Sequence, residues 1–281
     1  MRRRGFTLVE VLVVISILAM LVSILLPALR AAREQARAGV CGAKIRQLLL
    51  ALCNYDQAQG SFPYGFILPE AVRGDHILYP GELNRLWDPP GRWWFDYSLK
   101  VDYVFGDGLD VLKCPSKHQG DPALSRDILA GNYGANPWIC RVTEPLTSYA
   151  KTFGGRPLSF ATIPQPASRL LLVDSGYSII CWWHATEQPP VALSDSPLKL
   201  PGTAYVPGLS INKDKNLLPG QTDDAVNGRH PNKTVNVGFV DGHVDRRRAE
   251  ELLVKSTDDG WDCSPFWQPR RETITAPGTS P

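Results

Sequence analysis

The side chains best suited to chemistry in this sequence lie near its C-terminal end, where His230, Asp241 and His243 fall around one predicted turn. Two imidazoles and a carboxylate that converge across a hairpin can hold a metal ion. We favour a simpler interpretation, a turn aspartate with a hydrogen-bonded histidine beside it, and keep the metal site as the alternative. Elsewhere the sequence contains no serine nucleophile elbow, phosphate-binding glycine loop, dinucleotide fingerprint or H-E-x-x-H motif. We therefore predict no catalytic residues and no enzymatic activity.

Six cysteines form a second candidate set, because disulfides are common in exported domains. Cys41 and Cys53 lie on one predicted helix, about 18 Å apart by helical rise, so they cannot bond to each other within a subunit. Cys114 and Cys140 are the pair that we favour for a disulfide. Cys41 and Cys53 face the apolar side of their helix, and we expect them to be packed thiols.

Near its N-terminus the chain has a long apolar segment, which determines where the rest of the chain lies relative to a membrane. Residues 6–29, "FTLVEVLVVISILAMLVSILLPAL", carry Glu10 as their only charge and follow three arginines. As a helix they would extend about 36 Å, enough to span a bilayer. The arginines should stay in the cytoplasm, which places the chain after residue 30 outside.

Glu10 needs an explanation in such a segment. A carboxylate in hydrocarbon costs about 2.5–3.5 kcal/mol on insertion scales, so it is a functional candidate by default. The alternative is a carboxylate near the interface that is tolerated because it can snorkel. A secretory signal peptide fits poorly, since the apolar run is long and Arg30 and Arg33 follow it directly. A plain membrane anchor fits the length but gives Glu10 no purpose.

Residues 28–55 should continue the helix, because they are rich in Ala, Leu, Arg and Gln. The spacing predicts one rod from Phe6 to about Asn54, roughly 70–75 Å long. Its first half would lie in an apolar environment such as lipid, and its second half would pack on a head. The stripe predicted to face that head consists of Cys41, Ile45, Leu48, Leu49 and Leu52.

The head should contain an antiparallel sheet, which makes the predicted fold class α+β. Predicted strands are Ser168–Asp174, Tyr177–Trp183, Thr234–Val240 and, after the Asp241-Gly242 turn, His243–Asp245. We expect a short helix around Arg247–Lys255. If Tyr177–Trp183 is a strand, one of Trp182 and Trp183 should be buried and the other exposed. Core packing is favoured over sugar stacking for these rings and for Trp93-Trp94.

The string "RRRGFTLVEVLVVISIL" closely resembles the leader of type IV pilins and type II secretion pseudopilins. The resemblance implies cleavage between Gly5 and Phe6 by a prepilin peptidase and N-methylation of Phe6. Glu10 would pair with the terminal amine of a neighbouring subunit, so that two buried charges neutralise each other. Pro27 matches the helix-kinking proline of that family.

The head resembles a pseudopilin-like family with a C-terminal H-X9-DG signature. The strings that carry the resemblance, in order, are "CGAKIRQLLLALCNYDQAQGSFP", "LKCPSK", "NYGANPW", "PASRLLLVDS" and "RHPNKTVNVGFVDGHVD". Here ten residues, not nine, separate His230 from Asp241-Gly242, which puts the equivalence of His230 in doubt.

Related pseudopilins bind calcium in a C-terminal loop, and Asp223, Asp224, Asn227 and Asp241 offer oxygen ligands. Their spacing matches no established calcium loop. We therefore expect no cofactor, with calcium as the alternative.

Charge and the resemblance together bound the function. The net charge is +2, and without the first three arginines 27 basic residues face 28 acidic ones, which argues against a nucleic-acid partner. We expect a structural subunit of a pilus or pseudopilus, anchored in the bacterial inner membrane with its head in the periplasm, that meets other pilin subunits and prepilin peptidase. The alternative is an anchored envelope protein that binds polysaccharide and does not polymerise. The expected division is leader 1–5, membrane and assembly helix 6–29, amphipathic continuation 30–55, head 56–255 and C-terminal tail 256–281.

Overall fold

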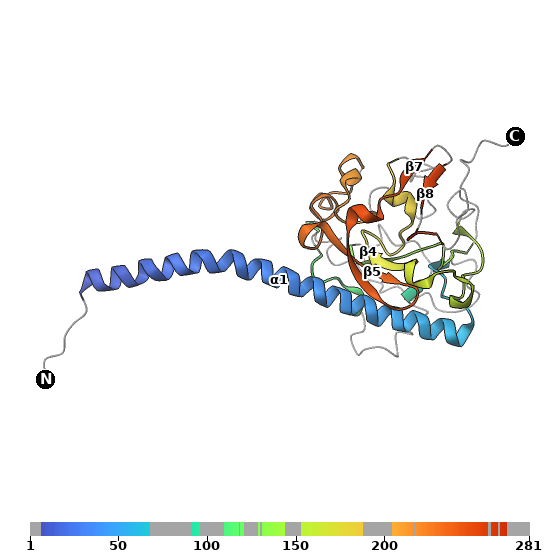
Figure 1. The fold of residues 1–281 in the computed structure, drawn as a ribbon, viewed down its shortest axis with the longest axis horizontal. Coiled ribbons are helices and arrows are strands. Elements are labelled where there is room, and N and C mark those ends of the chain that lie inside the picture. The colour runs from blue at the N-terminus through green and yellow to red at the C-terminus, as the bar shows by residue number, and fades with distance from the viewer. Residues whose placement is uncertain are drawn as a thin grey trace.

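A long helix that carries a loop-rich head dominates the computed structural model of the chain (Figure 1). The structure describes residues 7–67, 92–95, 110–117, 119–120, 129, 131–143, 153–187, 204–215, 217–257, 260–263 and 265–268. Gly5 and Phe6, the predicted processing site, lie outside these residues.

The helix α1 spans Leu8–Gln59 without a break. It begins with a capping box, in which Thr7 caps the backbone of Glu10 and Glu10 reaches back to Thr7. It ends at Gly60, which adopts the left-handed conformation that favours glycine at a helix C-terminus. The predicted end near Asn54 was therefore five residues early. Pro27 lies inside the helix and does not end it, and the helix bows along its length (Figure 1).

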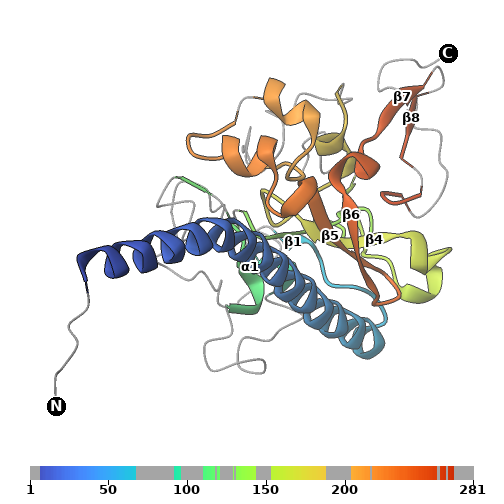
Figure 2. The same ribbon diagram turned by 60° about the vertical axis from the view of Figure 1, so that its left-hand side comes forward.

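The two halves of α1 have different surroundings. The N-terminal half projects from the head, whereas the C-terminal half lies along it (Figure 2). The predicted apolar stripe is confirmed, because its five members are all fully buried against the head. The buried face of α1 consists of Ala38, Cys41, Ile45, Leu48, Leu49, Leu52 and Asp56.

A four-stranded antiparallel sheet forms the centre of the head and confirms the α+β class. Its strand order is β3 (Tyr133–Ala135), β4 (Leu170–Asp174), β5 (Thr234–Phe239) and β6 (Val244–Arg248). All five residues of β4 are buried, as expected for a strand covered on both faces.

Close approach of α1 to β5 depends on a glycine in the strand. A Cβ placed on Gly238 would lie 2.7 Å from Ile45 Cγ2 and 2.7 Å from Leu49 Cδ1. Such distances are well inside van der Waals contact, so only glycine lets the helix backbone come this near to the sheet.

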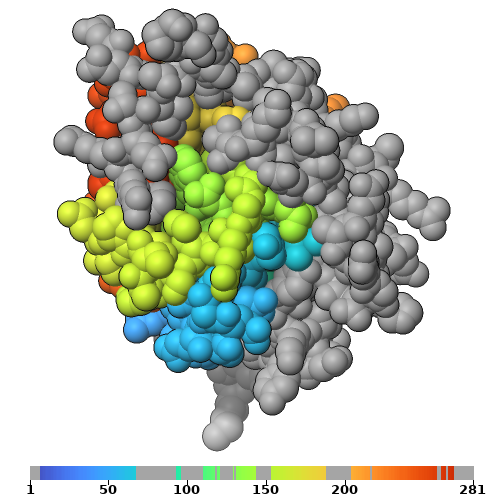
Figure 3. Space-filling view, turned by 90° about the vertical axis from the view of Figure 1, so that its right-hand side faces the viewer, coloured from blue at the N-terminus to red at the C-terminus, as the bar shows by residue number. Residues whose placement is uncertain are grey.

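Short elements make up the rest of the described head. The C-terminal end of α1 lies beside the segment that follows residue 153 (Figure 3). Asp56 at this end accepts the backbone N–H of Phe160. The remaining strands form two hairpin-like pairs, β1 (Phe66–Ile67) with β2 (Arg92–Trp93) and β7 (Lys255–Thr257) with β8 (Gly260–Asp262). The short helices are η2 (Asp110–Leu112), η3 (Phe160–Thr162), η4 (Pro166–Ser168), η5 (Trp182–Ala185), η7 (Ser210–Asp214), η8 (Asp223–Asn227), η9 (Pro231–Lys233) and η10 (Ala249–Leu252).

The structure corrects the prediction for Tyr177–Trp183. This segment makes one isolated bridge, from Ile179 to Ala135, and then turns into the 3-10 helix η5. Trp182 and Trp183 are both buried, so the expectation that one would be exposed was wrong. The alternation rule applies to strands, and these residues are helical. Core use of the tryptophan pairs is confirmed, since Trp93 and Trp94 are buried as well.

The C-terminal part of the head also differs from the prediction. The expected helix over Arg247–Lys255 is reduced to the four residues of η10, because β6 extends to Arg248 and β7 starts at Lys255. The head continues past residue 255, where we had placed the start of the tail. Trp267 is buried and donates from Nε1 to the carbonyl of Leu252.

Candidate functional site

The N-terminal end of α1 holds Glu10 in a local network. Glu10 Oε2 accepts hydrogen bonds from the backbone N–H of Thr7 and from its hydroxyl, both at 2.8 Å. Thr7 Oγ1 in turn accepts the backbone N–H of Glu10 at 3.3 Å. Within one chain, Glu10 therefore already has a structural role, which we did not predict from the sequence.

The surface of α1 from residue 8 to residue 29 is exposed and apolar. The strongly apolar stretch of α1 is entirely unburied in the single chain. A helix that is hydrophobic on all sides needs either lipid or other helices around it. By length and composition this helix can cross a membrane.

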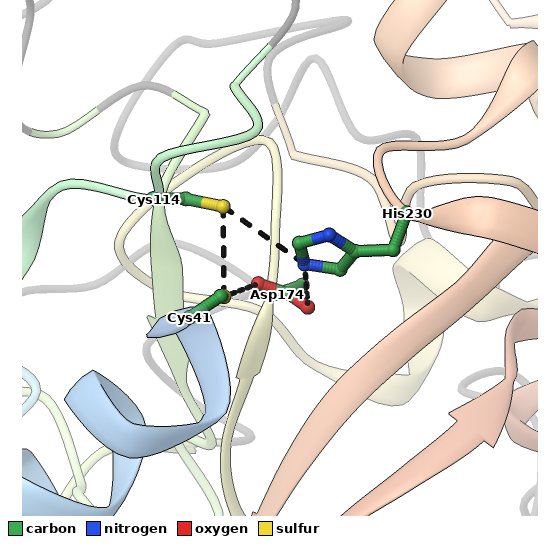
Figure 4. Close-up of side chains that lie close together, drawn as sticks. All are labelled: Cys41, Cys114, Asp174 and His230. Atoms are coloured by element: carbon green, nitrogen blue, oxygen red, sulfur yellow. Dashed lines mark hydrogen bonds and ion pairs between the residues drawn. The ribbon is translucent and has the colours of Figure 1, made fainter. Parts of the chain in front are cut away.

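A second site lies inside the head, where four ligand-type side chains meet. Cys41 Sγ lies 3.1 Å from Asp174 Oδ1 and 3.5 Å from Cys114 Sγ. His230 Nε2 lies 3.1 Å from Asp174 Oδ2 and 3.9 Å from Cys114 Sγ. The four side chains point toward one another (Figure 4), and their ligand atoms all lie within 4.8 Å. We call these four residues the interior cluster.

The four members come from segments far apart in the sequence. Cys41 lies on the buried face of α1, and Cys114 follows η2. Asp174 is the last residue of β4, and His230 precedes β5. Asn236 on β5 orients the carboxylate, since its backbone N–H and its Nδ2 donate to Asp174 Oδ2 at 2.7 and 3.3 Å.

Arg229 forms a buried charge network beside the interior cluster. Its Nη2 lies 2.6 Å from Asp224 Oδ2, and its Nε donates to Asp224 Oδ1 at 2.9 Å, so the pair is bidentate. Its remaining donors reach the carbonyls of Asn132 and Ser175. A contact of 3.8 Å links Arg229 to Asp174.

These neighbours control the ionisation of the interior cluster. Burial alone would raise the pKa of Asp174, but the ion pair with His230 and the nearby Arg229 lower it. Burial alone would lower the pKa of His230, but the Asp174 carboxylate raises it to about 9. Burial raises the pKa of Cys41 well above its usual range. Burial would also raise the pKa of Cys114, but hydrogen bonds with Cys41 and His230 outweigh it and lower that pKa to about 6.

Comparison with protein families identifies the N-terminal segment. Residues 1–26 match the prokaryotic N-terminal methylation motif. The chain therefore carries this motif, which is consistent with the resemblance of its first residues to type IV pilins. Residues 30–158 also match a family described as a protein of unknown function, DUF1559. No curated protein and no solved structure matches the chain significantly.

The structure does not bring His230, Asp241 and His243 together as a possible metal site. His230 is buried in the interior cluster, whereas Asp241 and His243 lie partly exposed at the β5–β6 turn. His243 Nδ1 lies 2.5 Å from Asp241 Oδ1, and its ring stacks on Phe239. Asp241 and His243 therefore match the favoured interpretation, a turn aspartate with a hydrogen-bonded histidine. Gly242 supplies the positive φ of 90° that this turn needs.

The oxygen ligands proposed for calcium have other partners. Asp224 binds Arg229 and accepts the hydroxyl of Tyr205, while Asp223 accepts a hydrogen bond from Asn227. Asp241 binds His243 instead. In the part of the chain that the structure describes, three or more His, Cys, Asp or Glu side chains lie close enough to share an ion only in the interior cluster.

The favoured disulfide is also corrected. Cys114 faces Cys41 and not Cys140, and all six cysteines are free thiols. Cys41 and Cys53 are not bonded to each other, as predicted, whereas the approach of Cys41 to Cys114 was not predicted. Neither Asp174 nor Cys41 was singled out as a ligand. The available signal was weak: both are polar or reactive residues within otherwise apolar, buried stretches.

Proposed function

We propose that the chain is a structural subunit that prepilin peptidase cuts between Gly5 and Phe6 and that assembles through α1 into a pilus or pseudopilus. Such a filament would serve secretion or surface attachment. The observation that carries the proposal is the exposed apolar half of α1 at the end of a chain with the N-terminal methylation motif.

The apolar character of the exposed surface supports assembly through α1. Large apolar side chains cover this half of the helix from Leu8 to Leu29 and are about half or more exposed. Beyond residue 29, the described residues add only Val40, Leu50 and Phe160 to the exposed large apolar side chains. Soluble monomers rarely expose so large a contiguous apolar surface. Lipid would cover it before assembly, and neighbouring helices would cover it in a filament.

Orientation follows from the charges that flank the apolar half. The arginines at positions 2–4 would hold the leader in the cytoplasm, where the peptidase cuts, and the head would lie in the periplasm. The partners in this proposal are prepilin peptidase, the inner membrane and other pilin-like subunits.

The mature N-terminus tests the processing step. Intact-mass and peptide analysis of the chain from cells should find N-methylphenylalanine at Phe6 and no residues 1–5. Gly5→Val should block cleavage, because a branched side chain next to the cut replaces a residue without a Cβ. A deletion of the peptidase gene should give the same uncut chain.

Assembly is tested by sheared-filament yield and by crosslinking between subunits. We expect both to be lost in the Gly5→Val variant while its level in the membrane stays unchanged. A processed chain that forms no crosslinked oligomers, or an uncut one that assembles normally, would contradict the proposal.

A further inference from the structure

We propose that Cys41, Cys114, Asp174 and His230 bind one zinc-class divalent cation in the interior of the head. This site goes beyond the filament role and does not depend on it. The match to the N-terminal methylation motif ends at residue 26, so all four of these residues lie outside it.

The spacing of the four ligand atoms suits a tetrahedral ion. Typical zinc bonds to sulfur, nitrogen and oxygen place neighbouring ligand atoms about 3.3–3.8 Å apart. Asp174 Oδ1 lies 3.1 Å from Cys41 Sγ, and Cys114 Sγ lies 3.5 Å from Cys41 Sγ and 3.9 Å from His230 Nε2. All four ligand atoms lie within 4.8 Å of one another, so a central ion would need them to draw together only modestly.

The donor types select the kind of ion. Two cysteine sulfurs and an imidazole favour zinc over calcium or magnesium, which prefer oxygen ligands. Four protein ligands complete a tetrahedron and leave no open position for water, which is the pattern of structural zinc sites. The interior cluster is also closed to solvent, since Cys41 and Asp174 are fully buried and Cys114 and His230 are at most 5% exposed.

Neighbouring side chains orient the Asp174 carboxylate so that one of its oxygens can bind the ion. Both hydrogen bonds from Asn236 go to Oδ2 of Asp174, which leaves Oδ1 directed at Cys41 and available as a ligand. In known metal sites, donors behind the ligands orient them in the same way. Asp224, at 2.6 Å, is the nearer partner of Arg229, whose Nη1 also lies 3.8 Å from Asp174 Oδ1.

The position of the site gives it a mechanical role. One ligand comes from α1, and the other three come from the head (Figure 4). An ion bound by all four would tie the assembly helix to the domain that it carries. Cross-links that close long loops have the largest effect on the entropy of the unfolded chain.

Metal analysis of the full chain tests the site directly. The chain, purified in detergent without a histidine tag or chelator, should contain about one zinc ion per chain. After removal of zinc, added Co²⁺ should give the intense visible bands of a tetrahedral site and the near-ultraviolet bands of sulfur bonded to cobalt. These two measurements need no variant, so they do not depend on how a variant folds.

Variants then assign the ligands. Cys114→Ser and Asp174→Asn should each lower zinc content at least several-fold, and Cys114→Ser should weaken the sulfur-to-cobalt band. Cys53→Ser is the matched control, because Cys53 lies on the same helix as Cys41 but outside the interior cluster, and it should keep full zinc content. Zinc removal should lower the melting temperature of the wild-type chain and of this control.

Three results would overturn the proposal. The first is a folded wild-type chain with no bound zinc and no tetrahedral Co²⁺ spectrum. The second is a Cys41–Cys114 disulfide found in the chain from cells by peptide mapping without reductant. The third is unchanged zinc content in a folded Cys114→Ser chain.

Discussion

Glu10 combines two properties that substitutions can separate: its negative charge and its hydrogen bonds with Thr7. In the single chain the carboxylate completes a capping box, so its presence does not by itself require a neighbouring amine. A role in assembly must therefore be shown by the charge alone.

We predict that Glu10→Gln will lower filament yield in cells by about tenfold or more, the order expected for the loss of one buried ion-pair partner. The amide oxygen of Gln can still accept the backbone N–H of Thr7, so the start of the helix should be kept. The matched control is Thr7→Val, which removes the cap at a cost of about 1 kcal/mol but keeps the charge. Filament yield and helix content by circular dichroism measure the two effects. Normal yield in the Glu10→Gln variant would show that the charge is not needed.

Arg229 offers a second test at the scale of single residues. Its side chain and that of Asp224 are fully buried, so removal of one partner leaves an uncompensated charge in the core. We predict that Arg229→Met will lower the free energy of unfolding by about 3–5 kcal/mol. The double variant Arg229→Met with Asp224→Asn should be more stable than the single one, because Asn removes the charge and still accepts the hydroxyl of Tyr205. Chemical denaturation measures both. If the double variant were less stable than Arg229→Met alone, the main contribution of Arg229 would not be neutralisation of the buried Asp224 charge.

At the scale of elements, the contact between α1 and β5 packs the second half of the helix onto the sheet of the head. The sequence predicted both elements correctly, because the apolar stripe of the helix and the alternation of the strand are periodic signals. It could not predict their separation, which depends on the single missing Cβ of Gly238.

We predict that Gly238→Ala will destabilise the head by about 1–3 kcal/mol, since its methyl group would collide with Ile45 and Leu49. Gly39→Ala, on the helix that faces Gly238, is the matched control. Nothing lies within 4 Å of a Cβ at Gly39, so alanine there should stabilise α1 by up to about 1 kcal/mol. Thermal unfolding of both variants measures the difference. Equal melting temperatures would mean that the helix moves away from β5 without cost.

Predictions of strands from local sequence were wrong or missing where tertiary contacts determine the secondary structure. The run Tyr177–Trp183 has the β-branched and aromatic residues of a strand, yet it turns into η5 and packs Trp182 and Trp183 into the core. Segments 255–257 and 260–262 gave no strand signal in the sequence, but they pair with each other. In both cases the contacts made in the folded head, and not intrinsic preference, set the local structure.

At the scale of the whole molecule, the chain divides into an apolar rod and a folded head that shares the second half of that rod. The buried residues of α1 begin at Ala38, whereas the large exposed apolar side chains are concentrated between residues 8 and 29. The two requirements, assembly and folding, therefore fall on different parts of one helix.

We predict that a chain lacking residues 1–29 will be monomeric and soluble without detergent, with a cooperative thermal unfolding transition. The deletion removes all of the large exposed apolar side chains of the described residues except Val40, Leu50 and Phe160, and none of the buried face of α1. Size-exclusion chromatography with light scattering measures the mass, and the full chain without detergent should aggregate. Aggregation of the truncated chain would show that the head needs the first half of the helix to fold.

The sequence by itself determined the N-terminal methylation segment, the long helix and its buried stripe, and the antiparallel pairing around Asp241-Gly242. These are local or periodic features, so the spacing of residues along the chain is enough to define them. Only the tertiary structure decided that Cys41, Cys114, Asp174 and His230 meet, and that His230 lies apart from the pair formed by Asp241 and His243. The physical reason is that four separate segments supply one ligand each, and no periodicity along a sequence encodes which buried side chains face one another across a core.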